Sequence, residues 1–294
     1  MTRLFCFVGI VAGFTTVGWT QPTFRSAVEA VRVDVSVMRG VTPVSGLTAA
    51  NFGVVDSGVP QAIDSVSVDT VPLNIVLALD TSGSLSSEGL AHLVDAARGL
   101  VQSLKPGDSA ALMTFDEPAH LRVAMTRDHA RVLTALGGLK SEGATALYDA
   151  LFLAMQIRPE TTDARSVVLV FSDGRDTASW LSNASIVEVT RRSGVVAHVV
   201  QLQPAAWQGS TSITASDALD NIADAAGGRR WSARSSKGLR ELFAQVLEEL
   251  RSRYLLTYYP SGVAGAGWHE VKVSLKGARG DVIARPGYFV SPAP

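Results

Sequence analysis

The densest group of oxygen ligands in the sequence lies in the segment 80–84 (DTSGS), which carries Asp80, Ser82 and Ser84. An apolar stretch over 73–79 precedes this segment, which is typical of a buried strand. Ligands of open α/β sheets bind at the carboxyl ends of the strands, so we expect these side chains at a binding edge. Because the group offers only oxygen atoms, it suits a hard divalent cation such as Mg²⁺.

Two later segments place further oxygen ligands beside predicted elements. Thr145 lies in a turn with Gly143, directly before a predicted helix, and Asp173 follows a second apolar stretch over 166–172. A single serine or threonine at such a position is more often a helix cap than a ligand, so the argument for a metal site depends on the combination. The candidate metal ligands are Asp80, Ser82, Ser84, Thr145 and Asp173.

The region that must position these residues alternates predicted strands and helices over 71–253. This alternation indicates an α/β fold with a doubly wound, mostly parallel six-stranded sheet and helices on both faces. The predicted strands are 74–80, 110–115, 119–125, 166–172, 195–201 and 229–232, and the predicted helices are 86–104, 127–139, 146–157, 183–193, 215–226 and 237–253.

The direction of each element predicts where the candidate ligands meet. A hairpin at 116–118 reverses the chain, and the helix over 127–139 brings it back to the edge at which Asp80 lies. Thr145 therefore emerges at that edge. Asp173 reaches the same edge, because the strand before it runs parallel to the strand that ends at Asp80.

This combination resembles the metal-ion-dependent adhesion site of von Willebrand factor A (VWA) domains. That pattern is Asp-x-Ser-x-Ser, then a distant Thr and a distant Asp, and all five positions match here. The resemblance covers the segment 71–253. With its flanks, VRVDVSV at 31–37 and RPGYF at 285–289, the chain is similar to secreted VWA-related proteins of acidobacterial type.

The resemblance implies that Ser82, Ser84 and Thr145 touch the cation directly, while Asp80 and Asp173 act through water. It implies Mg²⁺, or else Mn²⁺ or Ca²⁺. Mostly neutral ligands would leave the cation electron-poor, with a position open to an acidic side chain of a partner protein. The function implied is a protein-binding module for adhesion or assembly in a bacterial envelope, and not an enzyme.

Short alternating segments flank the α/β region on both sides. Residues 21–70 form a predicted β-rich segment, and residues 254–294 contain three further predicted strands. The first α/β strand is entered, and the last helix is left, at the edge away from Asp80. We therefore expect the two flanks to pack together there and to share one small sheet.

Residues 1–20 have the pattern of a secretory signal, with Arg3 before an apolar run over 4–17. The run is short for a membrane span, so we expect cleavage, a secreted or periplasmic protein, and no stable membrane span. Cys6 is the only cysteine, so the cleaved chain would have neither a disulfide nor a thiolate metal site. A net charge of −1 without a basic stripe argues against nucleic acid as a partner.

Several other residues have two interpretations each. Asp116 and Glu117 lie at the binding edge but are more simply a polar hairpin tip, and Asp176 is either a neighbour of the metal ligands or a loop residue. Trp180 and Trp207 follow strand ends, where each either forms a rim around the metal face or covers its own loop.

Two other functions remain open for the same site. One is a Mg²⁺-dependent hydrolase, although Ser82 stands where a second acid would be needed and no general base is recognisable. The other is a structural envelope protein whose metal only tightens the fold. The five histidines are scattered without metal-ligand spacing, and they suggest no further site.

Overall fold

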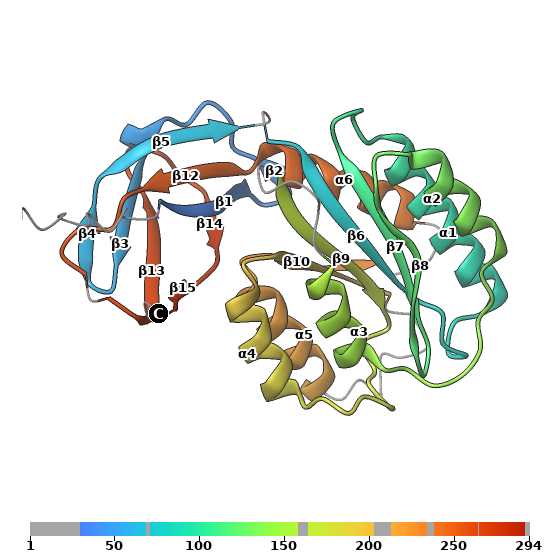
Figure 1. Ribbon diagram of the computed structural model, residues 1–294. Helices are drawn as coiled ribbons and strands as arrows, with labels where there is room; N and C mark the ends of the chain where they lie inside the picture. The colour runs from blue at the N-terminus through green and yellow to red at the C-terminus, as the bar shows by residue number, and fades with distance from the viewer. Residues whose placement is uncertain are drawn as a thin grey trace, which may run out of the picture.

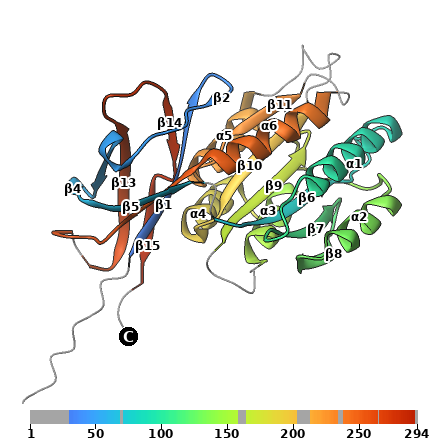
Figure 2. The same cartoon turned by 90° about the horizontal axis from the view of Figure 1, so that it is seen from above.

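The computed structural model describes residues 30–68, 71–157, 164–202, 213–233, 238–263 and 265–291. The predicted signal over 1–20 and Trp207 lie outside these residues. The described chain forms an α/β part and a β part, which lie side by side in Figures 1 and 2.

The sheet of the α/β part has six strands in the order β11-β10-β9-β6-β7-β8. Parallel pairing joins β6 (Leu73–Asp80), β7 (Ser109–Phe115), β9 (Arg165–Ser172), β10 (Val196–Leu202) and β11 (Arg230–Ala233). The edge strand β8 (Ala119–Thr126) pairs antiparallel with β7, as the hairpin at 116–118 requires. The predicted fold class, a six-stranded and mostly parallel sheet, is confirmed.

Helices cover both faces of this sheet (Figure 1). One face packs against α1 (Ser87–Gln102), α2 (His129–Ala135) and α6 (Leu239–Ser252), and the other against α3 (Leu147–Gln156), α4 (Asn183–Ser193) and α5 (Ile213–Ala225). The predicted helix over 127–139 is shorter than expected, because it passes into a 3₁₀ turn at Leu136–Gly138, where two glycines disfavour the α-helix.

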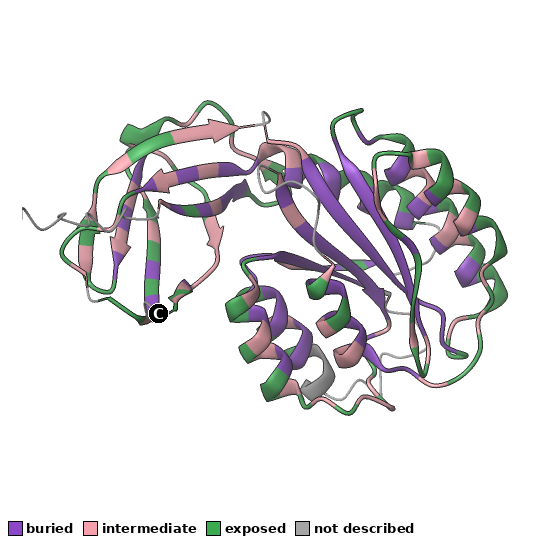
Figure 3. Cartoon of the chain, in the orientation of Figure 1, coloured by how far each residue is buried: buried purple, intermediate pink, exposed green. Residues whose placement is uncertain are grey.

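The central strand β6 is apolar except for Asn74 and the terminal Asp80, because helices cover both of its faces. Ile75, Leu77 and Leu79 pack against one layer of helices, while Val76 and Ala78 pack against the other. All of its residues are buried, which Figure 3 shows as continuous purple along the strand. A strand covered on both faces has no alternation of apolar and polar residues, and the two polar residues of β6, Asn74 and Asp80, lie near its two ends.

The β part contains two antiparallel sheets instead of the one that we expected. The first has the order β14-β1-β12-β5, with β2 paired to β1, and the second has the order β15-β13-β3-β4. Their strands are β1 (Val31–Arg39), β2 (Thr42–Pro43), β3 (Phe52–Asp56), β4 (Val59–Gln61), β5 (Ile63–Val68), β12 (Tyr254–Tyr258), β13 (Gly267–Leu275), β14 (Asp281–Ala284) and β15 (Gly287–Val290).

Two sheets form because apolar and polar residues alternate along these strands. Each sheet therefore has one apolar face, which the other sheet covers. Val33 and Leu256 of the first sheet share a buried core with Phe52, Val54 and Val271 of the second. Both sheets combine strands from the two ends of the chain. The strand β12, for example, lies between β1 and β5.

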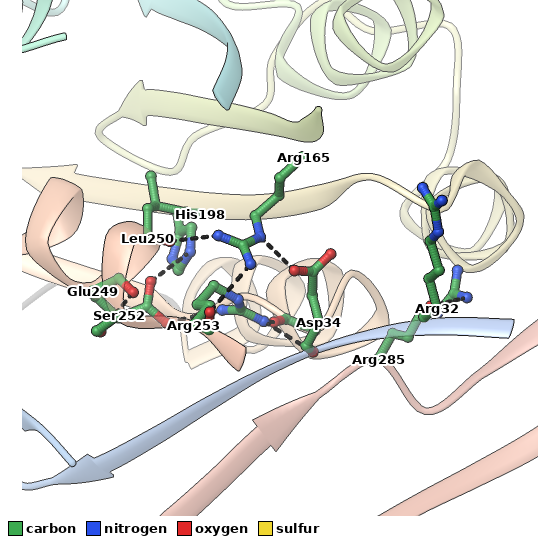
Figure 4. A network of polar contacts seen from close by, with 10 residues as sticks. Arg32, Asp34, Arg165, His198, Glu249, Leu250, Ser252, Arg253 and Arg285 are labelled. Carbon is green, nitrogen blue, oxygen red and sulfur yellow. Dashed lines mark hydrogen bonds and ion pairs between the residues drawn. The ribbon is translucent and has the colours of Figure 1, made fainter. Parts of the chain in front are cut away.

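A buried polar network joins the β part to the α/β part (Figure 4). Arg165, at the first position of β9, forms an ion pair with Asp34 of β1 and donates hydrogen bonds to the carbonyls of Leu250 and Arg253, at 2.7 and 3.2 Å. Arg253 in turn donates to Glu249 at 2.8 Å. Because Arg165 begins β9, this junction lies at the edge of the sheet opposite to Asp80.

Candidate metal centre

The loop after β6 gathers the first three candidate ligands. Asp80 is buried at the end of the strand, and its Oδ1 accepts a hydrogen bond from the backbone N–H of Ser82 at 2.9 Å. This is the local turn that aspartate favours. The hydroxyls of Ser82 and Ser84 lie 3.0 Å apart, with Ser82 buried and Ser84 exposed. The spacing of alternate residues therefore directs all three side chains into one small region.

In the loop after β9, the carboxylate of Asp173 is also fixed by a hydrogen bond from the backbone two residues further on. Its Oδ1 accepts the backbone N–H of Arg175 at 2.9 Å. Its Oδ2 is buried and has no hydrogen-bond partner among the described residues. Gly174 adopts φ +88° at this turn, where a Cβ would lie 2.8 Å from Nε2 of Gln201, so only glycine fits there.

Ser172 connects the two aspartates. Its hydroxyl donates to Oδ2 of Asp80 at 2.8 Å and accepts from the backbone N–H of Gly174 at 3.1 Å. Burial raises the pKa of Asp80 above its ordinary value; hydrogen bonds from Ser82 and Ser172 oppose this rise, and the nearby charge of Asp173 adds to it. Two carboxylates share this edge, and a bound cation would compensate the charge that both carry.

Thr145 is held against the same loop by its backbone. Its N–H donates to Oγ1 of Thr177 at 3.0 Å, and its carbonyl accepts the N–H groups of Thr177 and Ala178 at 2.8 and 3.0 Å. Thr145 itself is buried. The loop that carries Asp173 therefore also fixes the position of Thr145.

Hydrogen bonds also join the Thr145 loop to the serine loop. The N–H of Glu142 donates to the carbonyl of Thr81 at 2.9 Å, and the N–H of Gly83 donates to the carbonyl of Gly143 at 3.0 Å. The Ser141 hydroxyl donates to the carbonyl of Ser82. The structure thus brings the loops of all five candidate ligands to one edge of the sheet.

The chemistry of this edge depends on hydroxyl oxygens. Within the described ranges, no group of three or more His, Cys, Asp or Glu side chains is placed to hold a metal ion. A cation bound here would need Ser82, Ser84 and Thr145 in addition to the two aspartates. The buried Oδ2 atom of Asp173, for which the described part of the chain supplies no hydrogen-bond partner, fits such a ligand set.

Four residues that support the site were missed in the sequence: Ser141, Asp149, Ser172 and Thr177. Ser172 could have been found, because it is the last residue of a buried strand and directly precedes Asp173. The other three bind backbone groups that are distant in sequence: Ser141 donates to the carbonyl of Ser82, Thr177 accepts the N–H of Thr145, and Asp149, in α3, accepts the N–H of Trp180. The residue pattern gives no signal for such contacts.

The structure places four of the residues with two interpretations, namely Asp176, Asp116, Glu117 and Trp180, while Trp207 lies outside the described residues. Asp176 accepts the backbone N–H of Leu147 at 2.9 Å, so it caps α3. Asp116 accepts the N–H of Ala146 through its backbone carbonyl at 2.8 Å, while Glu117 is exposed at the hairpin tip. Trp180 does not cover its loop, because it is 97% exposed.

Within the part of the chain that the structure describes, none of the helices combines the length and the apolar character needed to cross a membrane.

Comparison with known sequences places residues 75–175 against the family model of the von Willebrand factor type A domain. An uncharacterised protein of Synechocystis sp. is 32% identical over 109 residues, which cover 36% of this chain and 26% of that protein. The chain therefore spans about a quarter of the length of this curated relative.

Two solved structures share the fold. The von Willebrand factor type A protein of Catenulispora acidiphila has a TM-score of 0.53 at 15% identity, covering 84% of this chain and 75% of that chain. Proximal thread matrix protein 1 of the mussel byssus, with zinc in its MIDAS motif (metal-ion-dependent adhesion site), has a TM-score of 0.54 at 17% identity. The match covers 66% of this chain and 49% of that chain. At these identities the likeness concerns the fold alone.

Proposed function

We propose that the chain is a metal-dependent protein-binding module, because residues 75–175 match the family model of the von Willebrand factor type A domain. In this proposal, a divalent cation at the Asp80 edge engages an acidic side chain of a partner protein. Domains of this type are mostly interaction modules, and a structural relative from the mussel byssus carries zinc in its MIDAS motif.

The observation that carries the proposal is the pair of neighbouring carboxylates at this edge. Asp173 has a buried oxygen without a hydrogen-bond partner among the described residues, and its charge adds to the rise in the pKa of Asp80 that burial causes. A divalent cation bound to Asp80, Ser82, Ser84, Thr145 and Asp173 would neutralise this pair. The cation is Mg²⁺, Mn²⁺ or Ca²⁺ in our proposal, because the ligands are all oxygen atoms.

The charge of this ligand set favours an acidic partner. Ser82, Ser84 and Thr145 contribute neutral hydroxyls that contact the cation directly in this proposal, while Asp80 and Asp173 act through water, so no negative group of the chain touches the cation. A carboxylate supplied by a partner gains most from a cation whose charge is least compensated. The predicted signal over 1–20 supports a secreted or periplasmic location, where the partner would be another envelope or extracellular protein.

The proposal is tested by capture of a partner from an envelope extract, with Mg²⁺ and with EDTA, on wild-type protein and on Thr145→Ala. This substitution removes a neutral ligand and keeps the backbone bonds to Thr177. Thr42→Ala, at an exposed residue of the β part, is the matched control. We expect capture by wild type and Thr42→Ala in Mg²⁺, and its loss in EDTA and in Thr145→Ala.

Other outcomes point to other functions. A partner that binds equally in all conditions would contact another surface, such as the β part, and the proposal would then be wrong. If EDTA and Thr145→Ala lower the unfolding temperature but change no binding, the metal is purely structural.

A further inference from the structure

One large apolar side chain near the candidate metal centre is almost completely in solvent. Trp180 is 97% exposed, whereas the other large exposed apolar residues of the described chain lie between 41% and 66%. Single exposed apolar residues are common, but an indole is among the largest apolar surfaces that a protein can present. Hydrogen bonds to its backbone show that the fold holds Trp180 in this exposed position.

The backbone on both sides of Trp180 is fixed by Asp149, in the first turn of α3. The carboxylate of Asp149 accepts the N–H of Trp180 at 2.9 Å and the N–H of Leu181 at 3.0 Å. In the opposite direction, the hydroxyl of Ser179 accepts the N–H groups of Tyr148 and Asp149, at 3.0 and 3.2 Å. The loop and the helix therefore cap each other, and the indole is held outward by an ordered loop.

The same loop positions a candidate metal ligand. Thr177, which binds the backbone of Thr145, is three residues before Trp180. An extended chain advances about 3.3 Å per residue, so the Cα atoms of Thr177 and Trp180 are at most about 10 Å apart. The exposed indole and the candidate metal centre consequently belong to one surface.

We propose that Trp180 is the apolar anchor of this binding surface. The partner would be a protein segment with an aliphatic or aromatic side chain two or three residues from the acidic residue that engages the cation. In an extended segment this separation spans roughly 7–10 Å, which lies within the upper bound of about 10 Å between the Cα atoms of Thr177 and Trp180. The inference rests on the proposed function, because it assumes that the acidic residue binds at the metal.

Trp180 is suited to this role by its stiffness. A tryptophan side chain has only two rotatable bonds, and the loop beneath it is already ordered by Asp149, so docking orders little further chain. Tryptophan is also enriched among the residues that contribute most of the binding energy of protein interfaces.

The test uses a library of short peptides with one fixed aspartate and all other positions randomised. The library is panned on the full chain in Mg²⁺ and in EDTA. We expect Mg²⁺-dependent enrichment of apolar residues two or three positions from the aspartate. The enriched peptides should bind Trp180→Ala on the order of tenfold or more weakly, with Trp180→Phe between the two. Trp268→Ala, at an exposed tryptophan of the β part, is the matched control and should bind as wild type does.

The outcomes separate this inference from the proposed function. Mg²⁺-dependent enrichment of acidic peptides without an apolar preference, and equal binding by Trp180→Ala, would overturn the inference and leave the proposed function intact. Enrichment that is the same in EDTA would overturn both. The fluorescence of Trp180 gives an independent measurement, because a peptide that covers the indole should shift its emission to shorter wavelength.

Discussion

Thr145 and Thr177 bind each other in both directions. The N–H of Thr145 donates to the hydroxyl of Thr177 at 3.0 Å, and the N–H of Thr177 donates to the carbonyl of Thr145 at 2.8 Å. These residues come from loops that are 32 positions apart in the chain. The position of a candidate ligand is therefore set by a residue that would not itself touch the cation.

Thr177→Val should weaken Mg²⁺ binding although it removes no ligand. The substitution keeps the shape of the side chain but deletes the oxygen that accepts the N–H of Thr145. Loss of such a supporting partner typically reduces metal affinity by about 10–100-fold. Calorimetric titration with Mg²⁺ measures the change, and Thr177→Ser, which retains the oxygen, should bind as wild type does. Equal affinities for the Val and Ser variants would contradict this role.

Asp80→Asn should abolish metal binding and preserve the fold. Asparagine has nearly the same shape, and its oxygen can still accept the N–H of Ser82. For wild type, Mg²⁺ at one hundred times its dissociation constant should add about 2.7 kcal/mol to the free energy of unfolding. Thermal unfolding with and without Mg²⁺ checks both statements. A variant that gains as much stability from Mg²⁺ as wild type would show that the cation binds elsewhere.

Asp34→Ala should destabilise the protein strongly, because it leaves the buried guanidinium of Arg165 without its carboxylate partner. Breaking a fully buried pair costs about 3–5 kcal/mol, and the partial exposure of Asp34 reduces this to about 2–3 kcal/mol. Asp95→Ala is the matched control, since Asp95 pairs with Arg240 on the surface, where solvent screens the pair, and its loss should cost much less than the loss of Asp34. Urea unfolding gives both values, and similar losses in the two variants would refute the expectation.

Tyr258→Phe should reveal a pH-dependent contribution from the β part. Burial alone would raise the pKa of Asp56, but hydrogen bonds to its carboxylate from Tyr288, Tyr258, Ser57 and His269 together lower it below 3.8. A lowered folded-state pKa means stability that is present above the unfolded value and lost as the pH falls through the folded value.

Tyr258 donates to Asp56 at 2.8 Å, and its removal should cost about 1.5–3 kcal/mol at neutral pH. The difference between wild type and Tyr258→Phe should shrink as the pH falls below about 4, because protonated Asp56 accepts a weaker hydrogen bond. Urea unfolding between neutral and acid pH tests this, with Tyr259→Phe, at the exposed neighbour, as a control. A difference that stays constant into acid would exclude Asp56 as its source.

The α/β part could be predicted from the sequence because local patterns determine it. The apolar run that ends at Asp80 and the run that ends at Ser172 each require a strand covered on both faces. The hairpin at 116–118 and the helices between them then set the direction of every later element. The meeting of the Asp80, Thr145 and Asp173 loops at one edge follows from those directions alone.

The contacts that hold the site together could not be predicted in this way. Thr177, in a loop, and Asp149, in the first turn of α3, accept hydrogen bonds from backbone groups of segments distant in the sequence, and many small polar residues have a similar local pattern. The β part was predicted only in outline for a related reason. Alternation shows that a strand such as β1 has one apolar face, but not which strands lie across from it, and β14 was missed because its four residues are too few for a clear pattern.

Arg253 alone separates α6, which ends at Ser252, from β12, which begins at Tyr254. Its fully buried guanidinium donates to Glu249 of the helix and, at 3.4 Å, to the carbonyl of Asp34 in the other part. Loss of structure in the β part would remove the contact to the Asp34 carbonyl, and loss of structure in the α/β part would remove Glu249, so either event breaks a contact of this buried charge. The two parts should therefore melt as one cooperative unit, with a single calorimetric transition whose measured enthalpy equals the van't Hoff enthalpy.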